Sequence, residues 1–410
     1  MHRIQRRTIV LLSLAQIFSG LATGAALSVG SLLAVELSGS EAWAGSVTVS
    51  VTLGAAVASA LLMRLAIARG RRFALSTGLL VATAGALGTI LAASLGWFWL
   101  LLVSALCIGA GTSVNLQARF AATDLSAPEH RGRDLSLIVW MSTVGSVAGP
   151  NLVGAGESIA SSIGVPGLAG VFVISTVAML LGLLVIWIGL RPDPLLLARD
   201  RAGVQAPPRP RFRDGLSAFS ASPRALAALI GMLLAHFTMV AVMSMTPVHL
   251  VHHGATVTIV GLTISLHIAG MFALSPLMGL AADRFGGLPV ASAGLGILVV
   301  ATGLAAFSAD SHALTTVGLV LLGVGWSAAT VAGSSVIVNA VAPDVRVAAQ
   351  GVSDTMMSLA GVLGGVLSGL ILAAVGYLGL GVACAVLCIA AIPLLTLLPR
   401  RRTPVVAARD

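Results

Sequence analysis

Four side chains that can bind metal form two short patterns on consecutive hydrophobic segments of the chain. The first pattern is Met239-Val-Ala-Val-Met243, and the second is His267-Ile-Ala-Gly-Met271. Residues four apart lie on the same face of an α-helix, one turn from each other. Thioether sulfur and imidazole nitrogen suit Cu(I) far better than Mg²⁺ or Ca²⁺. If both segments are helices, the spacing predicts a site for a soft metal ion.

The composition of the chain is that of a membrane protein. Of its 410 residues, 57% are hydrophobic and 9% are charged, and the mean hydropathy is +1.03. The apolar stretches are continuous rather than alternating and are long enough to cross a bilayer as helices, which excludes a β-barrel. We therefore expect an all-α membrane protein with twelve spans, at residues 8–35, 43–66, 73–94, 97–122, 133–156, 167–190, 224–250, 257–281, 288–308, 312–340, 347–375 and 377–398.

The arginines predict the orientation of these spans. All 23 basic residues are arginine, and every one falls on the same side of a twelve-span chain. The opposite loops contain only Glu36, Glu41, Glu157, Asp310 and some histidines. By the positive-inside rule, both termini are expected to be cytoplasmic. The net charge of +9 is thus a topology signal, and nucleic-acid binding is not needed to explain it.

A polar segment divides the spans into two groups of six. Residues 191–223 are rich in arginine and proline, and we expect a cytoplasmic linker there between six-helix bundles at 1–190 and 224–398, followed by a cytoplasmic tail at 399–410. The bundles repeat, because Ala-Pro-Glu-His-Arg at 127–131 recurs as Ala-Pro-Asp-Val-Arg at 342–346. Two six-span repeats are typical of secondary transporters whose substrate site lies near the midplane.

The two metal-binding patterns lie at compatible depths in the membrane. Measured from the outer ends of their spans, the four side chains lie about 10 to 21 Å deep at the helical rise per residue. Met239 and Met243 alone would be ordinary core methionines, but an ionisable residue such as His267 in mid-membrane is by default functional. A neutral His267 bonded to a neighbouring carbonyl is the alternative. We expect these two methionines, His267 and Met271 to bind one ion.

Further soft ligands gather around the two patterns. Residues 232–278 contain six of the twelve methionines and five of the eight histidines. They suggest an ion path inward along span 7, with one more ligand from span 11, formed by His249, His252, His253, Met245, His236, Met232 and Met356. The three outer histidines are equally consistent with solvated loop residues. The three cysteines, Cys107, Cys384 and Cys388, are expected to be core residues.

Energy coupling has one acidic candidate inside the membrane. Asp354 lies about 10 Å into span 11 by helical rise and is our candidate for the coupling residue. The alternative is an ion pair between Asp354 and a cytoplasmic arginine near the start of that span. Arg119 of span 4 is expected either to line the inner mouth of the cavity or to extend towards the lipid headgroups.

Over its whole length the chain resembles the major facilitator superfamily. Residues 279–286 are similar to a cytoplasmic loop signature of that family, which implies that Asp283 and Arg284 latch the cytoplasmic side. The matching loop after span 2 has Ile67 where the family places aspartate, so we expect a weaker latch there. Span 5 is similar to the family's antiporter motif, in which small residues permit close helix packing, with Gly145, Gly149, Pro150 and Gly154.

Within that superfamily, the paired patterns resemble the CcoA-like copper importers, proteins of the bacterial inner membrane that supply copper for haem-copper oxidase assembly. The resemblance implies that Met239, Met243, His267 and Met271 are the copper ligands. We expect copper as cargo, no cofactor, no enzymatic activity, copper chaperones as partners and a monomer in the lipid bilayer. Related members without these patterns include riboflavin transporters, so the patterns rather than the fold indicate the substrate.

Two other functions compete with copper import by alternating access. The antiporter-like motif favours a proton-coupled exporter of drug-like organic molecules, but a multidrug pocket is expected to be rich in aromatic residues, and this chain has 4%. A metal sensor on a transporter scaffold would need an added soluble domain, and the linker and tail are too short to supply one. Copper uptake is therefore the expected function.

Overall fold

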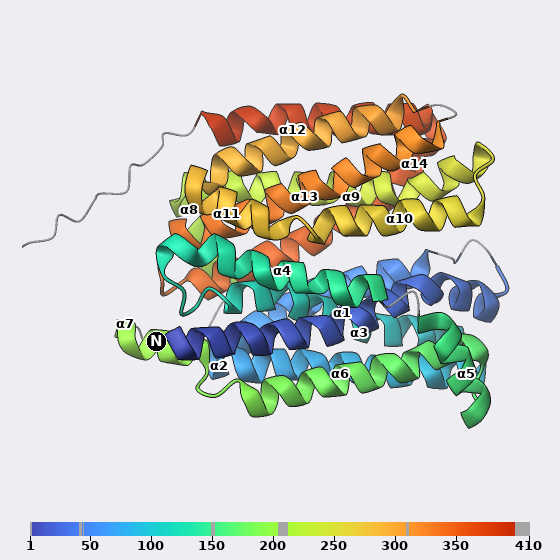
Figure 1. Cartoon of the computed structure of the whole chain (residues 1–410), viewed down its shortest axis with the longest axis horizontal. Helices are drawn as coiled ribbons and strands as arrows, with labels where there is room; N and C mark the ends of the chain where they lie inside the picture. The colour runs from blue at the N-terminus through green and yellow to red at the C-terminus, as the bar shows by residue number, and fades with distance from the viewer. Residues whose placement is uncertain are drawn as a thin grey trace, which may run out of the picture.

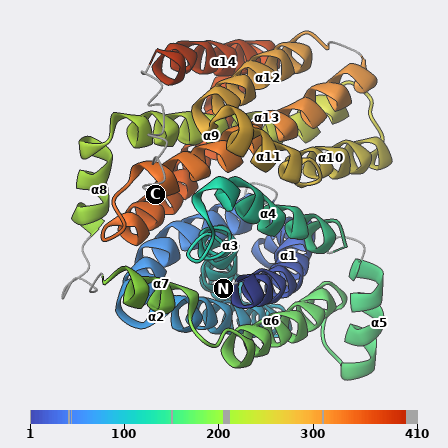
Figure 2. The same ribbon diagram turned by 60° about the vertical axis from the view of Figure 1, so that its left-hand side comes forward.

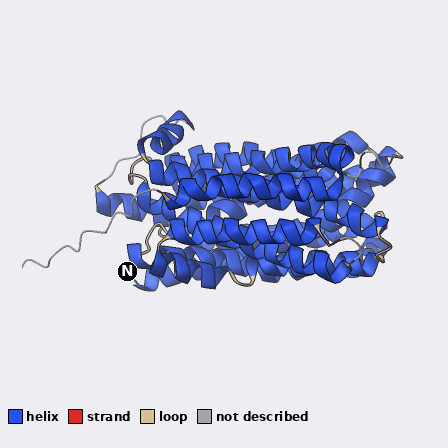
Figure 3. Ribbon diagram, turned by 90° about the horizontal axis from the view of Figure 1, so that it is seen from above, coloured by secondary structure: helices blue, strands red, loops and turns tan. Residues whose placement is uncertain are grey.

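A computed structural model describes the protein as two bundles of helices that lie side by side, with their axes roughly parallel (Figures 1 and 2). It describes residues 2–40, 43, 45–148, 152–203, 212–308 and 311–397, and all regular secondary structure within these ranges is helical (Figure 3). Eight of the described helical segments are long and apolar enough to cross a membrane. Two of them, 50 and 51 residues long, each contain two of the expected spans, so the fold agrees with twelve spans.

The N-terminal bundle contains the first six expected spans. Its helices are α1 (His2–Ser38), α2 (Ser46–Leu95), α3 (Phe98–Ala121), α4 (Arg131–Ala148), α5 (Val153–Ile163) and α6 (Gly170–Gly189). Spans 2 and 3 meet within α2 at Gly70, whose φ of 88° lies in the left-handed region that favours glycine. The described parts of span 5 belong to α4 and α5.

The C-terminal bundle repeats this plan. Its helices are α9 (Pro223–His252), α10 (Val257–Phe272), α11 (Ser275–Phe285), α12 (Gly287–Ala306), α13 (His312–Ala340) and α14 (Arg346–Thr396). Spans 11 and 12 meet within α14 at Gly376, which has a φ of 70°. Span 8, expected as one helix, is interrupted between α10 and α11.

The linker between the bundles contains two short helices that the sequence analysis did not predict, α7 (Pro194–Ala202) and α8 (Phe212–Ala221). The Asp193 carboxylate accepts hydrogen bonds from the backbone amides of Leu195 and Leu196 and so caps α7. α8 packs against α14, where Gly215 lies directly on the Ala348 carbonyl.

The two halves meet along α2, α3 and α4 of the first bundle and α10, α11, α13 and α14 of the second. The end of the molecule that carries α7, α8 and the starts of α4 and α14 is called here the Arg-rich end, and it lies at the left in Figure 1. Each bundle has an apolar core of its own, and the core of the second bundle is built from α9, α12, α13 and α14. The helices of each half therefore behave as a packed unit on either side of the interface.

Candidate functional site

His267 lies in the interior of the C-terminal bundle with one ring nitrogen occupied and the other free. Its side chain is fully buried on α10, and Nδ1 is 2.7 Å from the Leu319 carbonyl of α13. Nε2 is buried and has no hydrogen-bond partner among the described residues. The carbonyl bond is the one that a purely structural histidine would make. It also fixes the ring and leaves the Nε2 lone pair available, as in histidines that bind metal.

Trp326 on α13 brings the two patterns to one level of the bundle. Its indole Nε1 donates a 2.9 Å hydrogen bond to His236 Nδ1 of α9. Its ring also contacts the Phe272 ring of α10 in an edge-to-face arrangement, with the ring centroids 5.8 Å apart. Met239 is one turn beyond His236 on α9, and Met271 precedes Phe272 on α10. The two methionines therefore lie at similar depth, on helices that touch each other little and both pack against α13.

The three methionines among the expected ligands share one hydrophobic cluster but differ in exposure. Met239 and Met271 are buried, Met243 is half-buried, and all three pack in the cluster that contains Trp326. No group of three or more His, Cys, Asp or Glu side chains in the described part of the chain is arranged to hold a metal ion. Any metal site here depends on the methionine sulfurs together with His267.

Most residues of the expected ion path lie on α9, and Met356 lies on α14. Met232 is buried against Gly333 of α13, whereas Met245 and Met356 are half-buried against the same core. At the end opposite to the Arg-rich end, the His249 ring stacks on the Tyr377 ring, with the ring centroids 4.1 Å apart. The centroid of the exposed His253 ring lies 4.2 Å from that of His249. The side chain of His252 lies outside the described residues.

Arg119 and Asp354 form a buried ion pair across the interface between the halves. Arg119 Nη2 of α3 donates to Asp354 Oδ1 of α14 at 2.7 Å, and the two side chains are 2% and 0% exposed. Asp354 therefore pairs with an arginine of the other bundle, and not with one near the start of its own span. Because Arg119 is buried, the expectation that it extends towards the headgroups is wrong.

A second polar link lies one turn nearer to the Arg-rich end. Arg71 of α2 binds the Asp124 carboxylate at 2.8 Å within its own half, and its Nη2 donates to Gln350 Oε1 of α14 at 2.6 Å. Burial raises the pKa of the Asp124 carboxyl above its ordinary value, and the Arg71 guanidinium opposes that rise. In the sequence, the arginines after span 2 indicate only topology, and no local pattern there predicts the contact of Arg71 with Gln350.

Asp283 joins the halves at the Arg-rich end by capping a helix of the opposite bundle. Its two carboxylate oxygens accept hydrogen bonds from the backbone amides of Gly132 and Arg133, each at 2.8 Å, in the first turn of α4. Such amides have no partner within their own helix, and a carboxylate also interacts favourably with the positive end of the helix dipole. Arg284, expected to share this role, is exposed and lies over the Phe285 ring.

The expected span 5 motif has a packing contact within one half. Gly145 of α4 lies against the backbone of α1, where a Cβ atom would overlap the Ile17 carbonyl and the Leu21 amide. Gly149 and Pro150 lie outside the described residues. In the described part, the motif therefore joins α4 to α1 rather than one half to the other.

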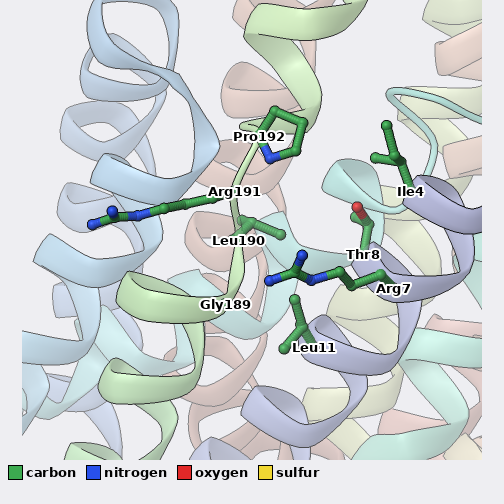
Figure 4. Close-up of a pocket in the computed structure, with 8 residues that line it drawn as sticks. All are labelled: Ile4, Arg7, Thr8, Leu11, Gly189, Leu190, Arg191 and Pro192. Atoms are coloured by element: carbon green, nitrogen blue, oxygen red, sulfur yellow. The ribbon is translucent and has the colours of Figure 1, made fainter.

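A small pocket opens at the Arg-rich end of the N-terminal bundle (Figure 4). It lies between α1 and the segment after α6, and it is lined by Ile4, Arg7, Thr8, Leu11, Gly189, Leu190, Arg191 and Pro192. None of these residues belongs to the interface between the halves or to the two metal-binding patterns. The pocket is therefore separate from the candidate site.

Two repeated helical bundles, joined by polar contacts at one end, are the arrangement typical of secondary transporters in membranes. The chain belongs to the major facilitator superfamily: the family model described as Major Facilitator Superfamily matches residues 12–256 and 228–410. It is accordingly a secondary transporter and not an enzyme.

The relatives agree on this family and differ in what is known of them. The chain is 40% identical to the uncharacterized MFS-type transporter YddS of Bacillus subtilis (strain 168) over 396 residues, which cover 96% of this chain and 91% of the relative. It is 28% identical to the riboflavin transporter RfnT of Brucella anthropi over 358 residues, 86% and 85% of the two chains. The crystal structure of the human organic anion transporter MFSD10 has the same fold, with a TM-score of 0.78 at 16% identity and coverage of 95% and 99%.

Proposed function

We propose that this transporter imports copper across the bacterial inner membrane by alternating access, with Met239, Met243, His267 and Met271 as ligands. The observation that carries the proposal is the state of His267. Its Nδ1 is held by the Leu319 carbonyl, and its buried Nε2 has no partner. A buried nitrogen without a partner is costly, and a metal ion that binds there would relieve the cost.

The donor set also suits transport rather than storage. Thioethers and a neutral imidazole favour Cu(I) and add no negative charge, so the bound ion keeps its charge and is released more easily than from thiolates. The proposed ligand set does not include the cysteines; Cys384 and Cys388 are buried, and Cys388 Sγ lies 3.5 Å from Thr238 Oγ1. The arginine distribution supports assigning the Arg-rich end to the cytoplasm.

Copper accumulation in cells tests the proposal. We expect Met239→Leu, Met243→Leu, Met271→Leu and His267→Gln each to lower uptake at least about tenfold, the lower range seen for loss of residues around a metal. Leucine keeps the volume of methionine, so the substitutions preserve packing. Met179→Leu, at a buried methionine of the other half, is the matched control and should transport normally. Wild-type copper uptake in all four variants, at equal protein levels, would end the proposal.

A riboflavin-type organic substrate is the second candidate. The similarity to the riboflavin transporter favours it. It is also favoured by buried polar atoms that have no hydrogen-bond partner, on helices that border the interface between the halves. These atoms are Thr112 Oγ1 and Asn115 Oδ1 of α3 and Ser327 Oγ and Thr330 Oγ1 of α13. Uptake of labelled riboflavin, unaffected by His267→Gln but lowered by Asn115→Ala, would favour this substrate over copper.

A further inference from the structure

The pocket at the Arg-rich end of the N-terminal bundle contains a buried hydroxyl group without a partner. Thr8 of α1 lines this pocket and is 3% exposed, and its hydroxyl makes no hydrogen bond to any described residue. Other buried threonines of this bundle, such as Thr83 and Thr89, donate to the carbonyl four residues before them. A buried polar group is costly to leave unpaired. The Thr8 hydroxyl therefore indicates a ligand that offers a hydrogen-bond acceptor.

The pocket also carries positive charge that no acidic side chain balances. Arg7 of α1 and Arg191 after α6 line it, and both side chains are exposed. Neither takes part in an ion pair with another described residue. The Arg7 side chain extends from α1 towards Leu190, whereas the Arg191 side chain extends to the other side of the segment (Figure 4). Arg7 is thus the guanidinium that an anion in the pocket would meet first.

The backbone around the pocket favours a negative charge as well. Asp193, which follows the residues of the pocket, directs its carboxylate to backbone amides of α7 and α2. The Gly189 carbonyl at the end of α6 accepts a hydrogen bond from the Arg191 amide at 2.8 Å. α1 begins at His2, so the positive end of its helix dipole lies in the turn that contains Ile4. An anion would therefore meet a guanidinium, a hydroxyl and the start of a helix.

The pocket lies at the level expected for lipid headgroups. Trp187 is exposed on α6 one turn before Arg191, and the guanidinium carbon of Arg72 lies 5.0 Å from the centroid of its ring. Tryptophan and arginine are typical of the border between membrane and water. Nearer to the membrane interior, α1 and α6 expose large apolar side chains, which are Val10, Leu14, Leu184 and Ile188. Acyl chains that lie on these side chains would bring a headgroup to the pocket.

Close packing limits the pocket on the side of the membrane interior. A Cβ atom on Gly189 would lie 2.6 Å from Leu11 Cδ2, so α6 contacts α1 directly at this point. The contact leaves no room between the two helices for an acyl chain. The group that fits between Arg7 and Thr8 is therefore a compact anion with several acceptor oxygens, such as a phosphate.

We propose that this pocket binds the phosphate group of an anionic phospholipid. Arg7 pairs with the phosphate, the Thr8 hydroxyl donates to one of its oxygens, and the acyl chains lie on the apolar faces of α1 and α6. Basic pockets between membrane helices bind anionic headgroups in this way. Inorganic phosphate offers the same oxygens, but the exposed apolar side chains beside the pocket favour the lipid. The bound lipid holds the start of α1 against the segment that leads from α6 into the linker.

Native mass spectrometry of the full chain in detergent tests the proposal. The probes are phosphatidylglycerol, phosphatidylcholine with the same acyl chains, and inorganic phosphate in large excess. We expect phosphatidylglycerol to bind more tightly than phosphatidylcholine and to stay bound in the presence of inorganic phosphate. Arg7→Gln should weaken the binding of phosphatidylglycerol about fivefold, as for one arginine at an anionic lipid surface. Thr8→Val, which keeps the shape of the side chain, should weaken it too.

The neighbouring arginine provides the matched control. Arg6 is exposed next to Arg7 on α1 and does not line the pocket, so Arg6→Gln loses the same charge and should bind phosphatidylglycerol normally. Arg7→Lys keeps the charge and should retain most of the binding. Equal weakening in Arg6→Gln and Arg7→Gln would reduce the effect to general attraction by the basic end and would overturn the proposal.

Three further outcomes would also overturn it. They are equal binding of phosphatidylcholine, displacement of phosphatidylglycerol by inorganic phosphate, and unchanged binding in both Arg7→Gln and Thr8→Val. Circular dichroism of each variant shows whether its helices are intact before binding is compared. Because no cargo enters the measurement, its result is independent of copper uptake.

Discussion

Equivalent residues in the two halves close the Arg-rich end by different means. Asp283 caps α4 of the opposite half with both carboxylate oxygens. At the equivalent position, Ile67 is buried in an apolar cluster with Val347 and Ala348, in the first turn of α14. Arg71 supplies the polar contact there, through Gln350. One half therefore closes by helix capping, and the other by apolar packing with an arginine bond.

The capped contact requires close approach of two backbones. Gly279 lies where a Cβ atom would overlap the Gly132 carbonyl and Ser136 Oγ of α4. We expect Gly279→Ala to disfavour the closed Arg-rich end by about 1 to 3 kcal/mol, as is typical of overpacking. Spin labels at Ala68→Cys on α2 and Arg284→Cys on α11, two exposed positions on opposite halves, measure this as a larger share of long distances in a chain whose three native cysteines are replaced by alanine. Gly296→Ala, at a glycine with open space around it, should leave the distribution unchanged.

At the scale of elements, the linker is attached to the helix pair of spans 2 and 3. Asp193 caps α7 with Oδ1, while its Oδ2 accepts a 2.7 Å hydrogen bond from the Arg72 amide just beyond the turn at Gly70. Arg199 Nη1 of α7 donates to the Ile67 carbonyl at 2.7 Å. Both ends of α7 are thereby joined to α2 around its turn at Gly70, so α7 moves with the N-terminal half.

Loss of the cap should loosen this attachment. In Asp193→Ala, the amides of Leu195 and Leu196 lose their acceptor, and we expect α7 to be destabilised by about 1 kcal/mol. Hydrogen exchange followed by mass spectrometry should show faster exchange in α7. Asp200→Ala, at an exposed aspartate of the same helix, is the matched control. Equal protection of α7 in the two variants would contradict the assigned role of Asp193.

At the scale of the whole molecule, orientation follows from charge. The arginines lie at one end of both bundles, and the inside-positive bias predicts that this end is cytoplasmic. Exposed serines provide a matched pair of reporters, Ser161 on α5 and Ser217 on α8. In intact cells, a membrane-impermeant maleimide should label Ser161→Cys, and it should label Ser217→Cys only after permeabilisation. The reverse result would invert the topology and the direction of transport.

The spans and the two-half organisation could be predicted because their signals are local. A run of apolar residues crosses a bilayer wherever it occurs, and a cluster of arginines resists translocation without reference to the rest of the fold. The side-chain types around His267 could be predicted in the same way, since spacing on one helix sets which residues share a face. The break in span 8 and the helices of the linker were not visible in this pattern of hydrophobicity.

The sequence by itself determined a repeated helical membrane carrier with paired methionine and histidine side chains on spans 7 and 8. Only the tertiary structure decided that Arg119 pairs with Asp354, that Arg71 reaches Gln350, and that His267 has one anchored and one free nitrogen. These contacts join residues far apart in the chain, and the pairing of Arg119 with Asp354 spans 235 positions. Their formation depends on how helices approach one another, which residue spacing along a single helix does not specify.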